Sequence, residues 1–389
     1  MILEGIININ KPAGMSSHDL VNMVRRLTGV KRIGHTGTLD PQATGVLPVC
    51  IGTASRITEY LDLDMKTYLC SMYLGVTSDT QDIWGKDVDD ERSRLKIAFS
   101  GGEKPFNEGD IVKALKSLSG VTEQVPPKYS AVWVNGRRLY DYARNGQEVE
   151  IPKRTIYIDS VEVIDIDMNE LKVTFRVTCS KGTYIRSICA DVGEKLGCGA
   201  AMCELTRESS GFFNLGNAVS FEFLKQLCER RERALEKLGR KNKHPRGRMN
   251  DADILKGGVR VLAKLYGVEE ALDAALEAEF DEIDSIVNKI IIYPDEPLKS
   301  FGRAKICTGD LADWFVGGGH IAMKEVEVLE KPRYQNEDFP LPIREEFRHA
   351  YRLYSPDMIF LGVAFYNFKY KKLVADKVFF HRDNRDIIR

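Results

Sequence analysis

The segment from Arg32 to Gly45 is the most informative stretch of this chain, because its residue types restrict the backbone strongly. It sets one carboxylate, Asp40, in a loop of small residues, with basic Arg32 and His35 upstream. Three glycines of the loop permit backbone geometries that a side chain would forbid, namely Gly34, Gly37 and Gly45. Pro41 biases Asp40 toward an extended conformation. Such a carboxylate suits an anionic nucleophile facing a polyanionic ligand, whereas the plainer alternative is an Asp-Pro turn with structural glycines.

The sequence around this loop predicts short strands and amphipathic helices. A strand is expected over residues 3–9, and a helix is expected from Ser16, where Asp19 completes a capping box, to Gly29. The predicted core face of this helix is Leu20, Val21, Met23, Val24 and Leu27. Further along the chain, residues 68–75 predict a strand and residues 110–118 predict a helix.

Residues 171–180 alternate apolar and polar side chains, which predicts a half-buried strand of an antiparallel sheet. Its expected inner face is Leu171, Val173, Phe175, Val177 and Cys179. A helix is expected to follow, with Thr183 as its N-cap and Gly197 as its end. Arg186 would then lie in the first helical turn, where a rigid scaffold can present a polar group to a cleft.

Several further motifs accompany the Asp40 loop in a fixed order. Before the loop stand Asn10-Lys11-Pro12 and Gly14-Met15-Ser16-Ser17, and after it stands Lys66-Thr67-Tyr68. Next come Gln124-Val125-Pro126-Pro127-Lys128-Tyr129-Ser130-Ala131, Gly136-Arg137-Arg138-Leu139-Tyr140, Ala143-Arg144 and Cys179-Ser180-Lys181-Gly182-Thr183-Tyr184-Ile185-Arg186-Ser187. Together with Gly34-His35-Thr36-Gly37-Thr38-Leu39-Asp40-Pro41, these motifs resemble the signature of the TruB family of pseudouridine synthases, in its bacterial form. The resemblance covers about residues 3–213.

This resemblance implies a fold and a reaction. The expected fold class is α+β, with a mixed, largely antiparallel sheet flanked by helices and a small C-terminal PUA-like β-barrel. The expected activity isomerises uridine to pseudouridine in the T-loop of tRNA, at position 55. That reaction breaks the bond between ribose C1′ and uracil N1, rotates the base and rejoins it through C5. Because nothing is oxidised or hydrolysed, no cofactor and no metal are expected.

The resemblance also implies roles for individual side chains. Asp40 is the expected catalytic carboxylate, either as a covalent nucleophile or as a base that promotes a glycal-type route. Arg186 is expected to hold Asp40 bidentately, and Tyr68 is expected to stack on the target uracil. Tyr184 and Leu205 are expected to line the pocket for the base.

Other residues are expected to meet the RNA. His35 would fill the space that the extruded uridine leaves, or would simply hydrogen-bond its own loop. Lys11 and Arg32 are expected as positioning contacts to RNA or as loop supports. The candidates for phosphate contacts are Lys128, Arg137, Arg138 and Arg144, each of which is equally well explained as a solvated surface charge. Asp82 matches an acidic position of the family, and no chemical step is assigned to it.

Composition limits the remaining possibilities. The 389 residues, with 43% hydrophobic and 29% charged side chains, suit a soluble globular protein of two or three domains. The formal net charge of −1 means that any RNA-binding surface must be local. Eight cysteines without a Cys-x-x-Cys pair, and six histidines without a cluster, favour reduced thiols over a zinc site. No signal peptide and no apolar run of membrane-spanning length is recognised, so a cytoplasmic protein is expected, with the tRNA T-arm as partner, no membrane and no obligate protein partner.

The chain is expected to divide into three parts. Residues 1–225 would form the catalytic domain, and residues 226–284 a charged helical insertion, which would be either solvated helices or an RNA-contacting arm. An apolar stripe predicts a helix in this insertion and comprises Leu272, Leu276, Phe280, Ile283 and Val287. Residues 285–389 would form the PUA-like RNA-binding barrel, with strands expected at 288–293, 321–329, 358–366 and 372–379.

Three other functions compete with this interpretation. The first is a guide-dependent synthase of ribosomal RNA, as in the dyskerin branch; Gln42-Ala43 and Val46-Leu47-Pro48 favour the standalone bacterial type instead. The second is a non-catalytic RNA-binding or tRNA-folding protein, against which the intact set of Asp40, Tyr68 and Arg186 argues. The third is an aspartate-nucleophile hydrolase, for which no second acid or base stands in the right motif.

Overall fold

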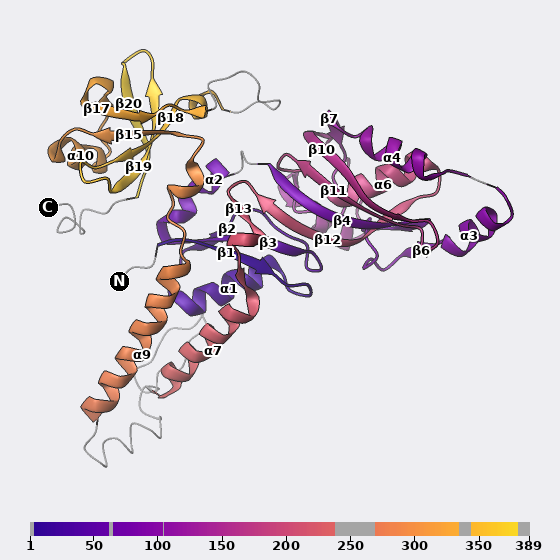
Figure 1. Ribbon diagram of the computed structural model, residues 1–389, viewed down its shortest axis with the longest axis horizontal. Coiled ribbons are helices and arrows are strands. Elements are labelled where there is room, and N and C mark those ends of the chain that lie inside the picture. Colours follow the sequence, from indigo (N-terminus) through magenta and orange to yellow (C-terminus); the bar gives the residue numbers. More distant parts are fainter. Residues whose placement is uncertain (1–3, 62–64, 104, 238–268, 334–343, 380–389) are drawn as a thin grey trace.

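A ten-stranded mixed sheet forms the centre of the computed structural model, which describes residues 4–61, 65–103, 105–237, 269–333 and 344–379 (Figure 1). Its strand order is β14-β1-β3-β12-β4-β11-β10-β7, with β2 added beside β3 and β13 beside β12. The strands are β1 (Gly5–Lys11), β2 (Ile33–His35), β3 (Thr44–Ile51), β4 (Lys66–Leu74), β7 (Gly120–Gln124), β10 (Arg154–Asp167), β11 (Lys172–Cys179), β12 (Ala200–Ser210), β13 (Phe213–Asn214) and β14 (Val219–Ser220). Only the β1–β14 and β12–β3 pairs are parallel among these, so the expected α+β class with a largely antiparallel sheet is confirmed.

Helices flank this sheet. Helices α6 and α4 pack over β12, β4 and β10, and α1 packs beside β2 and β3. The helices of this part of the chain are α1 (Ser17–Thr28), α2 (Thr58–Leu61), α3 (Arg92–Ser100), α4 (Glu108–Lys116), α5 (Leu139–Arg144) and α6 (Ile185–Leu196). Two short hairpins stand apart from the sheet, β5 (Val76–Ser78) with β6 (Val88–Asp90), and β8 (Trp133–Val134) with β9 (Arg137–Arg138).

Helix α1 forms as its sequence predicts. The Ser16 side chain accepts a hydrogen bond from the Asp19 backbone while the Asp19 carboxylate accepts one from the Ser16 backbone, which is the expected capping box. The helix ends at Gly29, whose φ of 71° is the left-handed conformation that favours glycine. The whole predicted face is buried. The expected strands and helix at residues 3–9, 68–75 and 110–118 are present as β1, β4 and α4, with ends shifted by one or two residues.

The alternating segment 171–180 forms β11, the middle strand between β4 and β10. Its apolar residues are fully buried and its polar residues are partly exposed, so the predicted half-buried antiparallel strand is confirmed. The expected cap of the following helix is wrong. Tyr184 is the N-cap residue of α6, and the Gln124 side chain accepts a hydrogen bond from the Tyr184 backbone N–H at 2.8 Å. The side-chain amide of Gln124, which is 60 residues away in the sequence, therefore takes the place of the expected Thr183 cap. No short-range sequence pattern could reveal this contact.

Gly45 and Gly37 need their flexibility, and Gly34 does not. Gly45 has a φ of +102°, and a Cβ there would overlap the backbone of Arg207, where β12 pairs with β3. Gly37 has a φ of +135°. Gly34 lies in β2 with open space beside its Cα, so this position does not use the conformational freedom that glycine permits.

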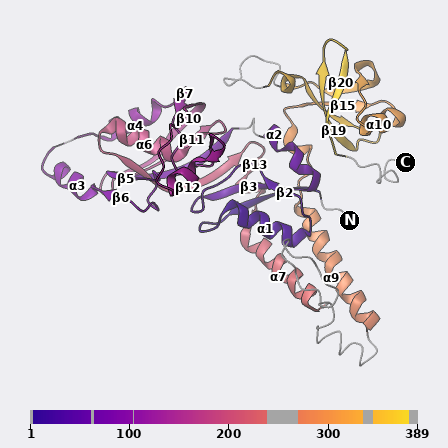
Figure 2. The same ribbon diagram turned by 180° about the vertical axis from the view of Figure 1, so that it is seen from behind.

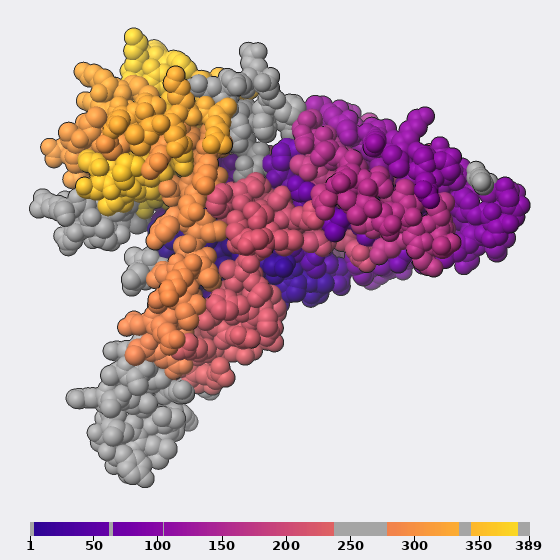
Figure 3. Space-filling model, in the orientation of Figure 1, coloured from indigo at the N-terminus to yellow at the C-terminus, as the bar shows by residue number. Residues whose placement is uncertain are grey.

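Two long helices, α7 (Phe221–Lys237) and α9 (Glu269–Ile290), lie side by side and project from the sheet as a separate arm (Figures 1 and 3). Leu224, Leu227, Ile283 and Val287 bury the base of this pair in the main core. Ion pairs join the two helices, Arg230 to Glu279 and Glu282, and Arg231 to Asp284. Both expected domain limits, at residues 225 and 284, fall inside these helices. The predicted side chains Leu272 and Leu276, and residues 238–268, lie outside what the structure describes.

A six-stranded sheet follows α9, in the order β16-β20-β19-β18-β15-β17. Its elements are β15 (Gly302–Ile306), α10 (Gly309–Val316), β16 (Ile321–Ala322), β17 (Val326–Glu330), β18 (Ala350–Tyr354), β19 (Phe360–Asn367) and β20 (Lys372–Val378). The strands expected at 358–366 and 372–379 are confirmed, and the run 321–329 is split by a short 3-10 turn at Met323–Glu325. The strand expected at 288–293 is wrong, because α9 continues to Ile290. A short isoleucine run fits a helix and a strand equally well.

Side chains of the two sheets form a common core. Helix α2 lies between the sheets (Figure 2). Tyr60 of α2 packs edge-on against Phe301 and Phe347 of the C-terminal part. Ile6 and Ile292 exchange two backbone hydrogen bonds of 2.9 and 2.8 Å. These contacts attach the second sheet to β1 and α2 of the first. None of the helices within the described ranges is long and apolar enough to cross a membrane.

Candidate active site

A cavity of about 1080 Å³ opens where the β2–β3 loop, β4, the β8–β9 hairpin and the start of α6 meet. Its walls include Asp40, Tyr68, Tyr184, Arg186 and Leu205, the residues that the sequence singled out for catalysis and base binding. Residues far apart in the sequence therefore meet in one place. The cavity is open to solvent and lined by polar and apolar side chains, as a site for a polar planar ligand requires.

Arg186 contacts both oxygens of Asp40, through one hydrogen bond and one ion-pair contact. Its Nε lies 2.9 Å from Asp40 Oδ2 and its Nη2 lies 3.3 Å from Asp40 Oδ1. The arginine side chain is only 7% exposed, whereas the aspartate is 38% exposed. The carboxylate is thus held in direction by a buried guanidinium and still faces the cavity. A bidentate pair of this kind is both charge-assisted and geometrically specific.

The guanidinium of Arg186 is itself fixed by other groups. Its Nη1 donates to the backbone oxygen of Thr80 at 2.9 Å, and its Nη2 donates to that of Tyr129 at 3.1 Å. Asp82 Oδ2 lies 3.8 Å from Nη1, so a second carboxylate stands behind the arginine. Burial raises the pKa of Asp82, while hydrogen bonds from Thr80 and the charge of Arg186 act in the opposite direction. The arrangement places Arg186 between two acids of unequal exposure.

Tyr68 is nearly buried in β4 and forms part of the cavity wall. Burial raises the pKa of its hydroxyl, which keeps the phenol neutral. The charge of Arg207, a fully buried side chain, acts in the opposite direction on this pKa. Arg207 Nε donates to the Val46 oxygen at 2.7 Å and Nη2 to the Gly37 oxygen at 3.2 Å. One arginine therefore connects the tyrosine to the loop that carries Asp40.

Lys11 supports the loop that carries Asp40. It has no exposed surface, and its ammonium donates to the backbone oxygens of Pro12, Met15 and Pro41 at 2.8, 2.6 and 2.9 Å. Burial lowers the pKa of Lys11 to about 8. This geometry suits the loop support that the sequence allowed, and it leaves the ammonium no surface at which a phosphate could bind.

His35 lies at the end of β2 and is half-buried. Its Nδ1 accepts a hydrogen bond from the Gly37 backbone at 3.2 Å. Burial, followed by the charge of Arg207, lowers the pKa of His35, so its imidazole is neutral near pH 7. The structure places His35 against its own loop rather than in the cavity wall, which corresponds to the second of its two expected roles.

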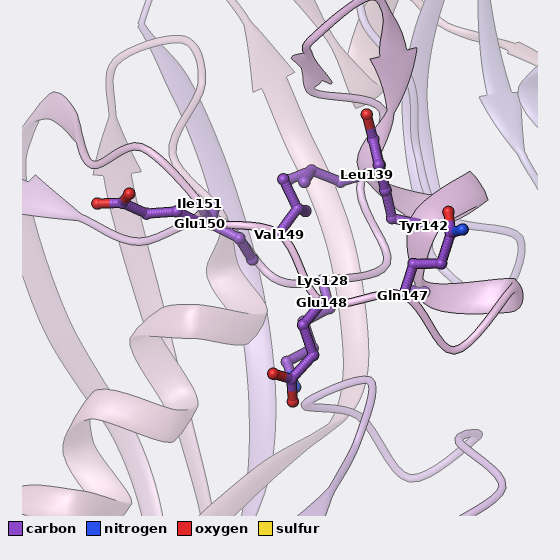
Figure 4. Close-up of a pocket in the computed structure, with 9 residues that line it drawn as sticks. Lys128, Leu139, Tyr142, Gln147, Glu148, Val149, Glu150 and Ile151 are labelled. Carbon is purple, nitrogen blue, oxygen red and sulfur yellow. The ribbon is translucent and has the colours of Figure 1, made fainter.

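The candidate RNA-contacting residues fall in different places. Arg144 lines the cavity, with its guanidinium 5.3 Å from the centre of the Tyr140 ring. Arg32 and Arg137 are exposed outside the cavity wall. Lys128 lines a smaller neighbouring hollow of about 400 Å³, which lies against α5 and the segment after it (Figure 4). Glu148 and Glu150 also line that hollow. No arginine is among its lining residues, so it has no pair like Asp40 and Arg186.

The sequence interpretation missed several side chains of the site. Arg207 follows the predicted Leu205 by two residues, yet nothing in its local pattern distinguishes it from a surface arginine. Trp133 also lines the cavity and was not selected. Further basic residues of the wall are Lys66, Arg154 and Lys181. Within the described ranges, no three His, Cys, Asp or Glu side chains gather as a metal site would need.

The fold is shared with chains of solved structures. A chain of a Cbf5-Nop10-Gar1 complex matches with a TM-score of 0.59 over 97% of this chain and 86% of its own length, at 22% identity. A chain of an H/ACA RNP bound to a substrate RNA containing 2'-deoxyuridine matches with a TM-score of 0.58 and 21% identity, over 97% and 86%. At such identities the likeness shows the fold alone.

Sequence comparison identifies the family. The model of the TruB family pseudouridylate synthase N-terminal domain matches residues 25–185, and that of the tRNA pseudouridylate synthase B C-terminal domain matches residues 186–241. The chain is similar to tRNA pseudouridine synthase B of Clostridium kluyveri, at 46% identity over 57% of this chain and 72% of the relative. The corresponding protein of Bacillus velezensis is 45% identical, over 58% and 71%. The chain therefore belongs to the TruB family, and it is an isomerase enzyme.

Proposed function

We propose that the protein converts uridine to pseudouridine in the T-loop of tRNA, at position 55. The observation that supports this proposal best is the contact between Asp40 and the buried Arg186, in the same cavity as Tyr68. The relatives named above carry the name tRNA pseudouridine synthase B. A nucleotide must leave its stack to reach a carboxylate at this depth, which a flexible RNA loop allows at the cost of a few kcal/mol.

Asp40 is proposed to be the catalytic group. It would either attack the ribose C1′ as the bond to uracil N1 breaks, or remove a ribose proton in a glycal-type route. In both routes the base turns, a bond forms between C1′ and C5, C5 loses its proton to solvent and N1 gains one. In the first route the bond from Asp40 to C1′ breaks as the C1′–C5 bond forms, and in the second the ribose proton is returned. No atom is gained or lost except that exchanged proton, so the reaction needs no cofactor.

The other side chains of the cavity are proposed to position the base. Arg186 keeps the carboxylate of Asp40 in one direction, and Tyr68 stacks on the uracil with its hydroxyl near C5. Tyr184 and Leu205 complete the pocket. Because the Tyr68 phenol is neutral, its ring serves as an uncharged platform, and stacking of this kind contributes on the order of 1–3 kcal/mol.

The remaining contacts extend the site along the RNA. His35 is proposed to fill the place of the extruded uridine, which requires it to leave the Gly37 backbone on binding. Arg32, Lys128, Arg137 and Arg144 are proposed to meet phosphates, which would make binding sensitive to salt. The C-terminal sheet, in residues 285–389, is proposed to be a PUA-like RNA-binding barrel, following the catalytic part (1–225) and the helical insertion (226–284). We expect a cytoplasmic enzyme that needs no obligate protein partner.

Release of tritium from C5-labelled uridine in an unmodified tRNA transcript tests this function. The wild-type protein should release tritium, and Asp40→Asn should abolish release while binding the transcript with similar affinity. A short T-arm hairpin should also be a substrate. Turnover that depends strictly on an added guide RNA would instead support the dyskerin-like alternative, and retained turnover in Asp40→Asn would remove Asp40 from the mechanism.

A further inference from the structure

The β8–β9 hairpin presents an exposed tryptophan at the rim of the catalytic cavity. Trp133 lines the cavity and is 59% exposed, although an indole is a large apolar surface that folding normally buries. The guanidinium of Arg138 lies 4.7 Å from the ring centre and covers one face. Because only one face of the Trp133 ring is covered, its other face is available to stack on a planar group.

The hairpin holds this pair in a fixed place. Trp133 and Val134 pair with Arg138 and Arg137, and the turn between them is Asn135-Gly136. Both turn residues have positive φ, 49° and 78°, as the tight two-residue hairpin turn requires. Arg138 Nη1 donates to the Ala131 oxygen at 2.6 Å, which fixes the guanidinium over the ring.

The neighbouring helix anchors the hairpin from the other side. The Leu139 backbone donates to the Val132 oxygen at 2.8 Å, and the Tyr142 hydroxyl donates to the Val134 oxygen at 3.3 Å. Leu139 and Tyr142 are among the residues that line the smaller hollow in Figure 4. A pre-ordered aromatic side chain loses little conformational entropy when it meets a ligand.

The position of the hairpin relates it to the reaction. The backbone oxygen of Tyr129 accepts from Arg186, and Trp133 follows four residues later, which spans at most about 14 Å of extended chain. The cavity volume of about 1080 Å³ reaches the upper end of the range for whole small-molecule ligands, about 300–1000 Å³, and therefore exceeds what one flat base fills. Arg144 and Arg154 bring positive charge to the same wall.

We propose that Trp133, backed by Arg138, stacks on an unpaired RNA base other than the target uridine. The inference rests on the proposed function in one respect, that the substrate is RNA. Trp133 would be a binding residue for a loop nucleotide beside the target and would take no part in bond making. Its contribution would therefore lie in affinity and in the choice of RNA, with the chemical step unchanged.

Binding of a T-arm hairpin RNA, measured for wild type and for Trp133 variants, tests this inference. Trp133→Ala should raise Kd about tenfold, while kcat at saturating RNA stays close to the wild-type value. Trp133→Phe should restore most of the affinity, because the smaller ring still stacks. Far-UV circular dichroism of each variant checks that the hairpin change leaves the fold intact.

Tryptophan fluorescence gives an independent readout, because the chain has three tryptophans. RNA should quench part of the emission of the wild type and of Trp314→Phe, since base stacking quenches an indole, and should not quench that part in Trp133→Phe. Abasic substitution of single loop nucleotides should identify one position at which wild type and Trp133→Ala bind equally.

The outcomes separate this inference from the proposed function. If the wild type releases tritium from the hairpin but Trp133→Ala binds as tightly as the wild type, the stacking inference fails and the function stands. Quenching that persists unchanged in Trp133→Phe would also overturn it. If the wild type releases no tritium but RNA still quenches its Trp133 emission, the proposed T-arm reaction is wrong. Trp133 would then remain an RNA-binding residue.

Discussion

Arg186 contacts Asp40 through two of its three guanidinium nitrogens, at 2.9 and 3.3 Å, while its third nitrogen faces Thr80 and Asp82. The arginine thus has no freedom to turn without breaking contacts on both sides. Because Arg186 is buried and Asp40 is partly exposed, the buried guanidinium fixes the direction of the carboxylate that faces the cavity. This is the arrangement expected where a carboxylate must meet a sugar carbon in a single direction.

The first prediction concerns Arg186→Lys. Lysine keeps the charge but offers a single ammonium, so it cannot bond both oxygens of Asp40 and also reach Thr80 and Tyr129. We expect kcat for tritium release to fall about 100-fold, the size associated with a misplacement of about 1 Å, with little change in tRNA affinity.

Arg176→Lys is the matched control for that variant. Arg176 also bonds two carboxylates, Glu162 and Glu208, but it lies on the open face of the sheet. Its replacement should change kcat by no more than about twofold. Equal losses in the two variants would mean that Arg186 acts through general stability rather than through Asp40.

The sequence predicted those parts of the fold that local patterns determine. The alternation in β11 and the capping box of α1 each depend on residues that are close in the chain, so they could be found without a structure. The N-cap of α6 could not, because Gln124 reaches it from β7. The strand predicted at 288–293 was wrong because a short apolar run carries no period; α9 continues to Ile290, which packs against the main core.

The sequence predicted those residues of the site that lie in recognisable motifs. Asp40, Tyr68 and Arg186 lie in recognisable motifs, and the structure brings them to one cavity. Arg207 was missed because its importance comes from burial, and a single arginine in a strand gives no sign of being buried. Trp133 was missed for the opposite reason, since an apolar residue in a short hairpin suggests core packing rather than exposure.

The second prediction concerns Lys11→Met. The change keeps the length of the side chain but removes the donor to the oxygens of Pro12, Met15 and Pro41. We expect the free energy of unfolding to fall by about 2 kcal/mol, from buried acceptors left unpaired. Urea unfolding measures this loss, and Lys31→Met, at an exposed position nearby, should leave the midpoint unchanged. A loss of tRNA affinity without a loss of stability would return Lys11 to the RNA-contacting residues.

The third prediction concerns pH and His35. Burial lowers the pKa of His35 in the folded protein, whereas an unfolded histidine titrates near 6.5. Between these two values the unfolded chain binds more protons, so the free energy of unfolding should decrease as the pH falls below about 6.5. Protonation of Nδ1 would also break the hydrogen bond from Gly37.

His35→Gln isolates this effect from other titrating groups. The variant should lose less stability than the wild type between about pH 6.5 and pH 5, when urea unfolding of the two is compared. An NMR titration of the wild type should place the His35 pKa below the value near 6.5 of an unfolded histidine. Identical pH dependence of the two proteins would contradict the prediction.

The fourth prediction concerns the helical arm. Ile283 is fully buried at the base of α9, where it packs into the main core. Ile283→Ala should lower the free energy of unfolding by about 3 kcal/mol, as removal of a buried aliphatic side chain usually does. Asp281→Ala, an exposed neighbour, is the control and should have little effect. If both variants have the same stability as the wild type, the arm is not part of the cooperative unit.

The fifth prediction concerns Arg207→Lys. Lysine cannot at once reach Val46, Gly37 and the Tyr68 hydroxyl, so the tyrosine and the Asp40 loop should lose their common anchor. We expect kcat to fall by roughly 100-fold with a smaller change in Kd for tRNA. Arg352→Lys, at another buried arginine in β18, should lower stability without a comparable fall in kcat.

A double-mutant cycle with Tyr68→Phe decides whether Arg207 acts through the tyrosine hydroxyl. If it does, Arg207→Lys should cost much less in the Tyr68→Phe background than in the wild type, because the contact it supports is already absent. Equal costs in both backgrounds would show that Arg207 works through Gly37 and Val46 instead. In that case the Asp40 loop should be the part that moves, and amide hydrogen exchange of residues 36–46 should increase in Arg207→Lys whether or not the hydroxyl is present.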